Sequence, residues 1–298
     1  MMQLNQTNEY NAILDGKYAD SELIIGLVGA VGTQLRRITE IIAERMPAYN
    51  YHAEIIRVSD NVIKQIFVPK SDSDSEYERI NKYMNLGNLA REQSGDNSIL
   101  ALGVASHILS KREPGDNDEI KPRKRVSYII NSLKHPEEVE RLREIYSRGF
   151  FLISVYSSEE SRKDVLINDK RMTEQQANDL IARDENEFIG HGQHTRDTFQ
   201  LADFFVHLDS NSDKTKKSLW RILDLVFGNP FLTPTFDEFA MFMAFASSVR
   251  SADLSRQIGA VIAKDEEIIA SGVNDCPRFG GGLFDARSHP ILHNFSLS

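Results

Sequence analysis

One segment near the N-terminus restricts the fold of this chain more than any other. An apolar run over residues 22–28 leads into a glycine-containing loop and then into a helical pattern over 33–45. A short apolar run bounded by glycines predicts a buried strand, and apolar residues spaced three and four apart predict a helix with one apolar face. Residues 51–58 predict a second strand. This order predicts an α/β protein with a parallel sheet.

The alternation of strands and helices continues along the chain. The further strands that we expect are 126–130, 150–156 and 202–208. The helices that we expect between them are 76–91, 99–109 and one that begins at His135. We therefore predict one doubly wound domain over 21–228, preceded by a flexible arm at 1–20.

A second domain is predicted after a stretch rich in Pro and Gly at 227–235, which marks a boundary. Beyond it we expect an amphipathic helix over 236–250. A hairpin with strands at 258–263 and 267–271 should follow. Residues 236–298 make up this second predicted domain.

The composition restricts the kinds of partner and the cellular compartment that we expect for the chain. A net charge of −9 disfavours general nucleic-acid binding, because neutralising phosphates needs clustered Lys and Arg. The short basic run at 121–125 is interpreted as a solvated loop. A single cysteine, Cys276, excludes an internal disulfide and fits a reducing compartment. The polar N-terminus is unlike a signal peptide, and no stretch approaches the roughly 20 apolar residues that span a bilayer. We expect a cytoplasmic protein with no membrane partner.

The glycine loop is the first candidate binding site. Gly26, Gly29 and Gly32 would let backbone N–H groups approach phosphate oxygens, and Thr33 opens the following helix, whose N-terminus favours anions. These four residues are the predicted contacts of a nucleoside triphosphate. A full Walker A loop reads GxxxxGK[ST], and here no lysine precedes Thr33. Two interpretations stay open, a degenerate phosphate loop and a turn that binds nothing, while the absent lysine disfavours an active kinase.

Two polar segments further along are typical of nucleotide kinases. Arg162 follows the strand expected at 150–156, where such enzymes place arginines that reach phosphates, and we include it among the predicted nucleotide contacts. A charged helix face is the alternative. Residues 183–196 are interpreted either as a lid over the loop or as a solvated segment.

The most specific stretch of the chain lies in the second domain. Residues 250–262, RSADLSRQIGAVI, and 268–275, IIASGVND, resemble the helix, turn and hairpin that open the zinc-dependent cytidine and deoxycytidylate deaminase fold. The resemblance implies that Asn274 holds the sugar or phosphate of a nucleotide, and its amide offers both donors and an acceptor. Three segments of the first domain resemble the P-loop half of the bacterial anti-phage dCTP deaminases. They are 130–143, 150–157 and 198–206.

This resemblance, over about 22–283, implies both a fold and a function. The fold is a P-loop kinase-like doubly wound parallel sheet, followed by a cytidine-deaminase-like α/β domain. The family comprises hydrolases that convert deoxycytidine nucleotides to deoxyuridine nucleotides and so starve phage replication. Zinc is the implied cofactor. Deoxycytidine nucleotides and, in some members, a small inhibitory RNA are the implied partners.

The sequence departs from the family at the zinc site. Deaminase chemistry needs His/Cys-x-Glu and a later Pro-Cys-x-x-Cys, in which His and Cys bind zinc and Glu moves protons. The 298-residue chain has 24 residues after Asn274, a single cysteine and no CxxC. The tripeptide HAE at 52–54 falls in an expected strand and is interpreted as coincidence, and His289 and His293 as part of a polar tail. We therefore expect a truncated or frameshifted deaminase domain with no catalytic residue and no metal ligand.

Two functions of different class remain open. The chain is either a member of the dCTP/dCMP deaminase family that lacks activity of its own, or a regulatory module that senses a nucleotide or RNA. An incomplete deaminase domain would expose apolar side chains, which favours self-association, so a homo-oligomer remains open as well.

We predict that the purified chain binds no stoichiometric zinc and does not convert dCTP or dCMP to the uracil form, because its sequence lacks the cysteine pair. Metal analysis and a deamination assay test this. Deamination above background that disappears on chelation would show the prediction to be wrong.

Overall fold

The computed structural model describes residues 21–67, 75–114, 119–186, 192, 194–208 and 212–276. The predicted arm at 1–20 lies outside the described residues. The chain divides into two compact units, Met1–Asn229 and Pro230–Ser298, each described by itself below. None of the helices in the described ranges combines the length and apolar character needed to cross a membrane.

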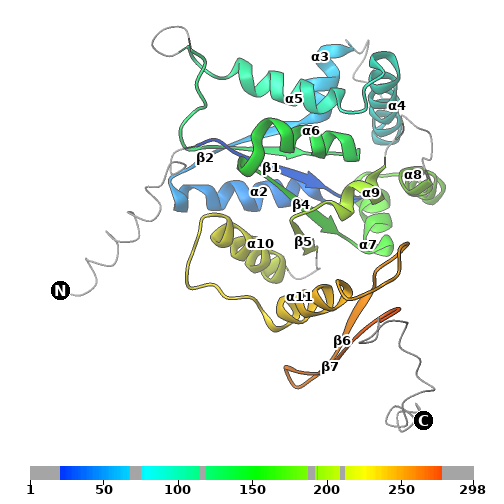
Figure 1. Cartoon of the computed structure of the whole chain (residues 1–298). Coiled ribbons are helices and arrows are strands. Elements are labelled where there is room, and N and C mark those ends of the chain that lie inside the picture. The colour runs from blue at the N-terminus through cyan, green and yellow to red at the C-terminus, as the bar shows by residue number, and fades with distance from the viewer. Residues whose placement is uncertain are drawn as a thin grey trace. The chain divides into compact units, whose positions relative to one another are not determined.

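A five-stranded parallel sheet lies at the centre of the first unit, with strand order β2-β3-β1-β4-β5 (Figure 1). The strands are β1 (Leu23–Val28), β2 (His52–Arg57), β3 (Val126–Asn131), β4 (Phe150–Tyr156) and β5 (Phe204–His207). Helices cover both faces of this sheet, so the predicted α/β class with a doubly wound parallel sheet is confirmed.

The helices of the first unit follow the strands in sequence. They are α2 (Leu35–Arg45), α3 (Lys64–Ile66), α4 (Glu76–Ser94), α5 (Ile99–Ser110), α6 (Pro136–Tyr146), α7 (Glu159–Asp164), α8 (Glu174–Asn186), α9 (Thr195–Gln200) and α10 (Ser212–Val226). Short 3-10 turns cover Met46–Tyr49 and Ser147–Gly149, and π-helical turns cover Val58–Ile63 and Val165–Asp169. Val58, predicted as the end of a strand, begins one of these π turns. Helices α8 and α10 were not predicted from the sequence.

Two hydrophobic cores lie on the two faces of the sheet. Helices α5 and α6 pack on one face through residues such as Ile108 and Leu142, and α2 and α10 pack on the other through residues such as Ile42 and Leu223. Figure 1 shows these helix pairs on opposite sides of the strands. A third, smaller cluster joins α8 to α4 and to the turn after α7.

The strand order places a crevice at the carboxyl end of β1. The chain leaves β1 for β2 and β3 on one side and for β4 and β5 on the other. In open parallel sheets, ligands bind where the direction of winding changes, outside the carboxyl ends of the strands. The glycine loop follows Val28 and therefore lies at this position.

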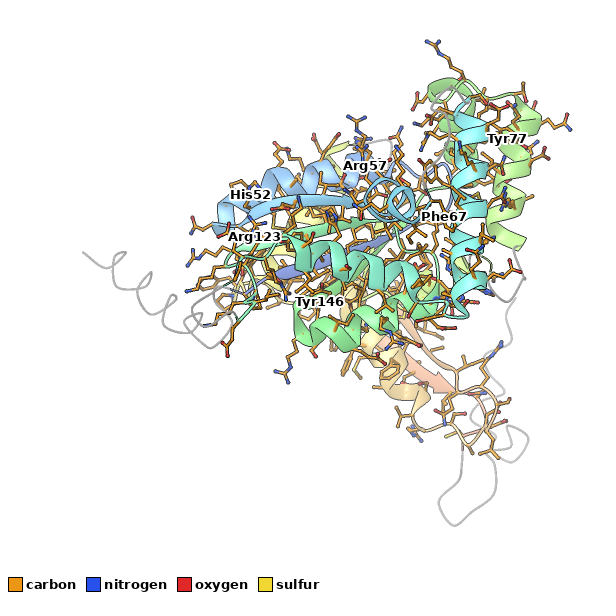
Figure 2. All side chains as sticks on the ribbon, turned by 90° about the horizontal axis from the view of Figure 1, so that it is seen from above. His52, Arg57, Phe67, Tyr77, Arg123 and Tyr146 are labelled. Carbon is orange, nitrogen blue, oxygen red and sulfur yellow. The ribbon has the colours of Figure 1, made fainter. Side chains whose placement is uncertain are left out.

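The tripeptide HAE at 52–54 lies in β2, an edge strand of the sheet. Figure 2 shows His52 at the amino end of β2 and Arg57 at the carboxyl end. The Glu54 carboxylate forms an ion pair with Arg123. This is the strand position that the sequence predicted for the tripeptide.

The second unit contains one helix and one hairpin in its described part. Helix α11 (Phe236–Ser248) begins with a capping box between Thr235 and Glu238. Strands β6 (Gly259–Lys264) and β7 (Glu267–Val273) pair antiparallel around a turn with positive φ at Asp265 and Glu266. Both elements were predicted, with slightly different ends. A Cβ at Gly259 would lie 2.0 Å from the Ala244 carbonyl oxygen, so only glycine lets the hairpin approach α11 this closely.

The second unit buries few side chains. Among its described residues only Ala244 and Ser251 are buried, each with 9% exposure, while Phe242 and Phe245 on α11 are 63% and 68% exposed. Burial of apolar area is the main favourable term in folding, and it must offset about 1–2 kcal/mol of backbone entropy per ordered residue.

We therefore predict that residues 236–276 exchange amide hydrogens faster and are cleaved by protease earlier than the sheet of the first unit. Limited proteolysis followed by mass spectrometry tests this in the full chain. Early cuts inside β1 or β3, with the 236–276 segment intact in a demonstrated monomer, would contradict it.

Candidate functional site: a cavity at the glycine loop

A cavity of about 580 Å³ opens at the glycine loop between β1 and α2. Gly29, Gly32 and Thr33 all line it, as predicted phosphate contacts would. Gly26 does not line it. That residue lies inside β1, where a Cβ would come within 2.9 Å of the Leu133 side chain, so its role is to allow close packing.

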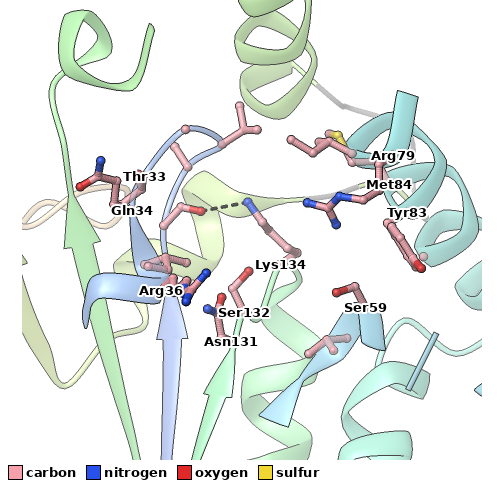
Figure 3. Close-up of a pocket in the computed structure, with 18 of the residues that line it drawn as sticks. Thr33, Gln34, Arg36, Ser59, Arg79, Tyr83, Met84, Asn131, Ser132 and Lys134 are labelled. Carbon is pink, nitrogen blue, oxygen red and sulfur yellow. Dashed lines mark hydrogen bonds between the residues drawn. The ribbon is translucent and has the colours of Figure 1, made fainter. Parts of the chain in front are cut away.

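The cavity has walls from segments far apart in the sequence. Opposite the loop, α4 contributes Arg79, Tyr83 and Met84, and Ser59 belongs to the turn after β2. Residues that follow β3, including Ser132 and Lys134, lie between the two walls (Figure 3). The cavity therefore has a glycine loop on one side and a wall with aromatic and apolar side chains on the other. This mixture is typical of sites that bind small ligands.

Cationic side chains outnumber anionic ones around the cavity. The six cations are Arg36, Arg37, Arg79, Arg91, Lys134 and Lys170, and the three anions are Glu40, Glu138 and Asp169. Hydrogen bonds to Glu76 raise the pKa of Arg79. Glu76 pairs with Arg79 and Lys170, and Asp184 pairs with Lys134, so these two acids offset part of the positive charge. The positive charge that remains favours an anionic ligand.

Lys134 supplies a cation at the loop, although the loop itself has no lysine. Its Nζ donates to the Gly29 carbonyl oxygen at 2.9 Å and to Asp184 Oδ1 at 3.0 Å (Figure 3 shows the first bond). The side chain is 18% exposed. Sequence reasoning missed Lys134 because it sought the lysine within the loop. The available signal was its place just after β3, a strand adjacent to β1 in the sheet.

Asp184 is a second residue that sequence reasoning did not single out as a site residue. It lies on α8, within the segment 183–196 that was interpreted as a lid or as solvated. Its carboxylate accepts a hydrogen bond from the Val31 backbone N–H at 2.8 Å. Asp184, near the start of that segment, is therefore buried and in contact with the loop.

The buried Glu138 carboxylate holds the backbone of Lys134 in place. Glu138 accepts from the Lys134 backbone N–H at 2.8 Å and from Arg91 Nη2 at 2.7 Å, and both of these ion-pair side chains are almost fully buried. His135 Nδ1 accepts from the Glu137 N–H at 3.2 Å at the start of α6. Burial lowers the pKa of His135, so the ring stays neutral and Nδ1 remains an acceptor.

Thr33 and Arg162 differ in their relation to the cavity. The Thr33 hydroxyl oxygen is buried and has no hydrogen-bond partner among the described residues. Arg162 is buried and does not line the cavity; its Nη1 lies 3.4 Å from the Val31 carbonyl oxygen, and its backbone packs against Gly32. The structure therefore places Arg162 against the backbone of the glycine loop and outside the cavity.

Asn274 belongs to the second unit, and its side chain makes several bonds there. Its Oδ1 accepts from Ser251 Oγ and the Ile258 N–H, each at 2.8 Å. Its Nδ2 donates to Asp253 Oδ2 at 3.1 Å and to the Arg256 carbonyl oxygen at 2.8 Å. These bonds hold the segment between α11 and β6 in place, which is a structural role for the amide.

The described part of the chain contains no group of three or more His, Cys, Asp or Glu side chains that would hold a metal ion. His289 and His293 lie outside the described residues.

Comparison with known proteins gives no family assignment. No family model and no curated protein matches the sequence. Among solved structures, a gluconokinase from Sinorhizobium meliloti 1021 is 12% identical with a TM-score of 0.40, over 71% of this chain and 96% of that one. A shikimate kinase from Acinetobacter baumannii in complex with shikimate is 14% identical with a TM-score of 0.33, over 72% and 99%. At such values these structures say nothing about the activity of this chain.

We predict that Gly32→Ala destabilises the first unit more than Gly95→Ala does. Both glycines have positive φ, 86° at Gly32 and 65° at Gly95. A Cβ added at Gly32 would lie 2.7 Å from the Arg162 carbonyl oxygen, whereas a Cβ added at Gly95 would have no atom within 4 Å. Backbone strain costs about 1–2 kcal/mol at each site, and the overlap at Gly32 adds at least about 1 kcal/mol. Urea unfolding measures both losses, and equal losses would contradict the contact with Arg162.

Proposed function

We propose that the first unit is a nucleotide-binding module in which the glycine loop and Lys134 hold the phosphate groups of a nucleoside di- or triphosphate. The observation that carries this proposal is the position of Lys134 Nζ, 2.9 Å from the Gly29 carbonyl oxygen. A lysine ammonium at a glycine loop is a point charge that binds phosphate, whichever element supplies it.

The surroundings of Lys134 support the same ligand. The loop lies at the switch point of a parallel sheet and before the N-terminus of α2, both of which favour phosphate. The Thr33 hydroxyl oxygen has no hydrogen-bond partner among the described residues, but it is buried, so its side chain must rotate before it can bond a phosphate oxygen or the Mg²⁺ of a nucleoside triphosphate. Tyr83 and Met84, across the cavity, offer an apolar wall for a base or sugar.

We further propose that the nucleotide is a deoxycytidine nucleotide and that the chain belongs with the anti-phage dCTP deaminases. The support is the sequence resemblance of both units to that family, together with the cavity at the glycine loop. In this proposal the first unit binds the family's nucleotide, and no described residue is given a catalytic role. A regulatory module that senses another nucleotide or a small RNA is the alternative.

Lys134→Met is expected to weaken the binding of dCTP and ATP by about tenfold or more, because the ligand loses a partly buried, charge-assisted contact. Lys217→Met is the matched control, since Lys217 is exposed on α10 and does not line the cavity. Calorimetric titration measures both, with thermal unfolding to confirm that each variant folds.

Equal affinities of Lys134→Met and Lys217→Met would count against the role of Lys134. Tighter binding of dCTP than of ATP or GTP would support the deoxycytidine proposal. Equal binding of all three would favour a general nucleotide module, and tighter binding of a structured small RNA than of any nucleotide would favour the alternative.

A further inference from the structure

The carboxylate of Asp184 lies against the glycine loop, although Asp184 is 153 residues from Val31 in the sequence. Its Oδ2 accepts from the Val31 N–H at 2.8 Å. Its Oδ1 accepts from Lys134 Nζ at 3.0 Å and from the Thr195 hydroxyl at 3.2 Å. The side chain is 1% exposed. A buried carboxylate therefore takes a loop amide and the cation that would otherwise be available to a phosphate.

A carboxylate and a phosphate make the same demands on such a site. Both are anions, and both accept hydrogen bonds from backbone N–H groups and from lysine. Two anions cannot accept from the same N–H, and like charges held a few ångströms apart disfavour each other. Asp184 and a phosphate group bound to Val31 N–H and Lys134 therefore exclude each other.

The helix that carries Asp184 is attached outside the two main cores. Helix α8 packs through Leu180 and Ile181 in the small third cluster, which is separate from the cores on the faces of the sheet. Arg183 adds two bonds to α4, to Asn81 and Asn85 at 2.9 and 2.7 Å. Small satellite clusters open at lower free energy than the main core. Movement of α8 away from the loop would therefore disrupt the third cluster and these bonds, but it would leave the two cores on the sheet intact.

We propose that Asp184 is an internal competitor for the glycine loop, which a phosphate-bearing ligand must displace before Val31 N–H and Lys134 can bind it. This inference rests on the proposed function. It makes Asp184 the residue that determines which anions bind: a polyphosphate carries enough charge to displace it, and a weakly charged anion does not. The apparent affinity of any ligand is the intrinsic affinity multiplied by the fraction of molecules in which Asp184 has withdrawn.

The test compares Asp184→Asn with the unmodified chain in calorimetric titrations with inorganic tripolyphosphate, orthophosphate and ATP. The neutral amide keeps the shape of the side chain but removes the competing charge, so tripolyphosphate and ATP should bind about tenfold or more tightly to the variant. Asp179→Asn is the matched control, because Asp179 is exposed on the same helix and the change removes the same charge. It should alter the affinities less than about twofold.

The outcomes separate the inference from the proposed function. The inference is supported if tripolyphosphate and ATP bind more tightly to Asp184→Asn than to the unmodified chain and to Asp179→Asn. It is also supported if these ligands bind only to Asp184→Asn. Equal affinities of all three proteins, or weaker binding to Asp184→Asn, overturn the inference and leave the proposed function standing. If neither tripolyphosphate nor ATP binds any of the proteins at millimolar concentration, both fail.

A second measurement uses the unmodified chain and so does not depend on the variant folding. Hydrogen exchange with and without saturating tripolyphosphate should show slower exchange in the loop at 29–35 and faster exchange in α8 at 174–186, because α8 loses its bond to the loop. Slower or unchanged exchange in α8, at a concentration that protects the loop, would overturn the displacement of Asp184.

Discussion

The central position of β1 between two parallel strands determines the arrangement of the first unit. β1 is hydrogen-bonded to β3 along one edge and to β4 along the other, and all six of its residues are buried. A ligand can therefore approach β1 only beyond an end of the strand. The pairing with β3 continues beyond the strand, where the Leu133 N–H donates to the Leu27 carbonyl oxygen at 2.9 Å. The same pairing places the next residue, Lys134, beside the glycine loop. The site is thus a direct consequence of strand order and register.

Glu138 fixes the backbone at Lys134 and His135. Its carboxylate accepts from the backbone N–H groups of Lys134 and His135 and from the buried guanidinium of Arg91. A buried carboxylate is tolerated only when its oxygens are paired in this way, and removing one partner of such a pair costs about 3–5 kcal/mol. The neutral His135 ring completes the start of α6. The backbone that carries the Lys134 ammonium is therefore held by a buried ion pair at the edge of the cavity.

Sequence reasoning predicted the local features of this unit and missed the ones that depend on tertiary contacts. The apolar runs and the glycine loop identified the strands of the sheet, because burial on both faces leaves a continuous apolar signature. Lys134 and Asp184 meet the loop across 105 and 153 residues, and no local pattern marks such contacts. For Asn274, the sequence indicated an amide with donors and an acceptor, but not that neighbouring residues use them all.

The position of Lys134 after β3, outside the glycine loop, explains why the Asp184 carboxylate lies beside its ammonium group. A lysine inside a phosphate loop is surrounded by the loop's own backbone, whereas one supplied by the end of β3 projects across the crevice toward α8. A partly buried ammonium needs an anion nearby, since burying an unpaired charge costs several kcal/mol. Asp184 meets that need and at the same time satisfies the Val31 N–H. A lysine that follows β3 thus provides the charge that binds phosphate even though the loop has none. Its partner Asp184, however, competes with phosphate for Lys134 Nζ and the Val31 N–H.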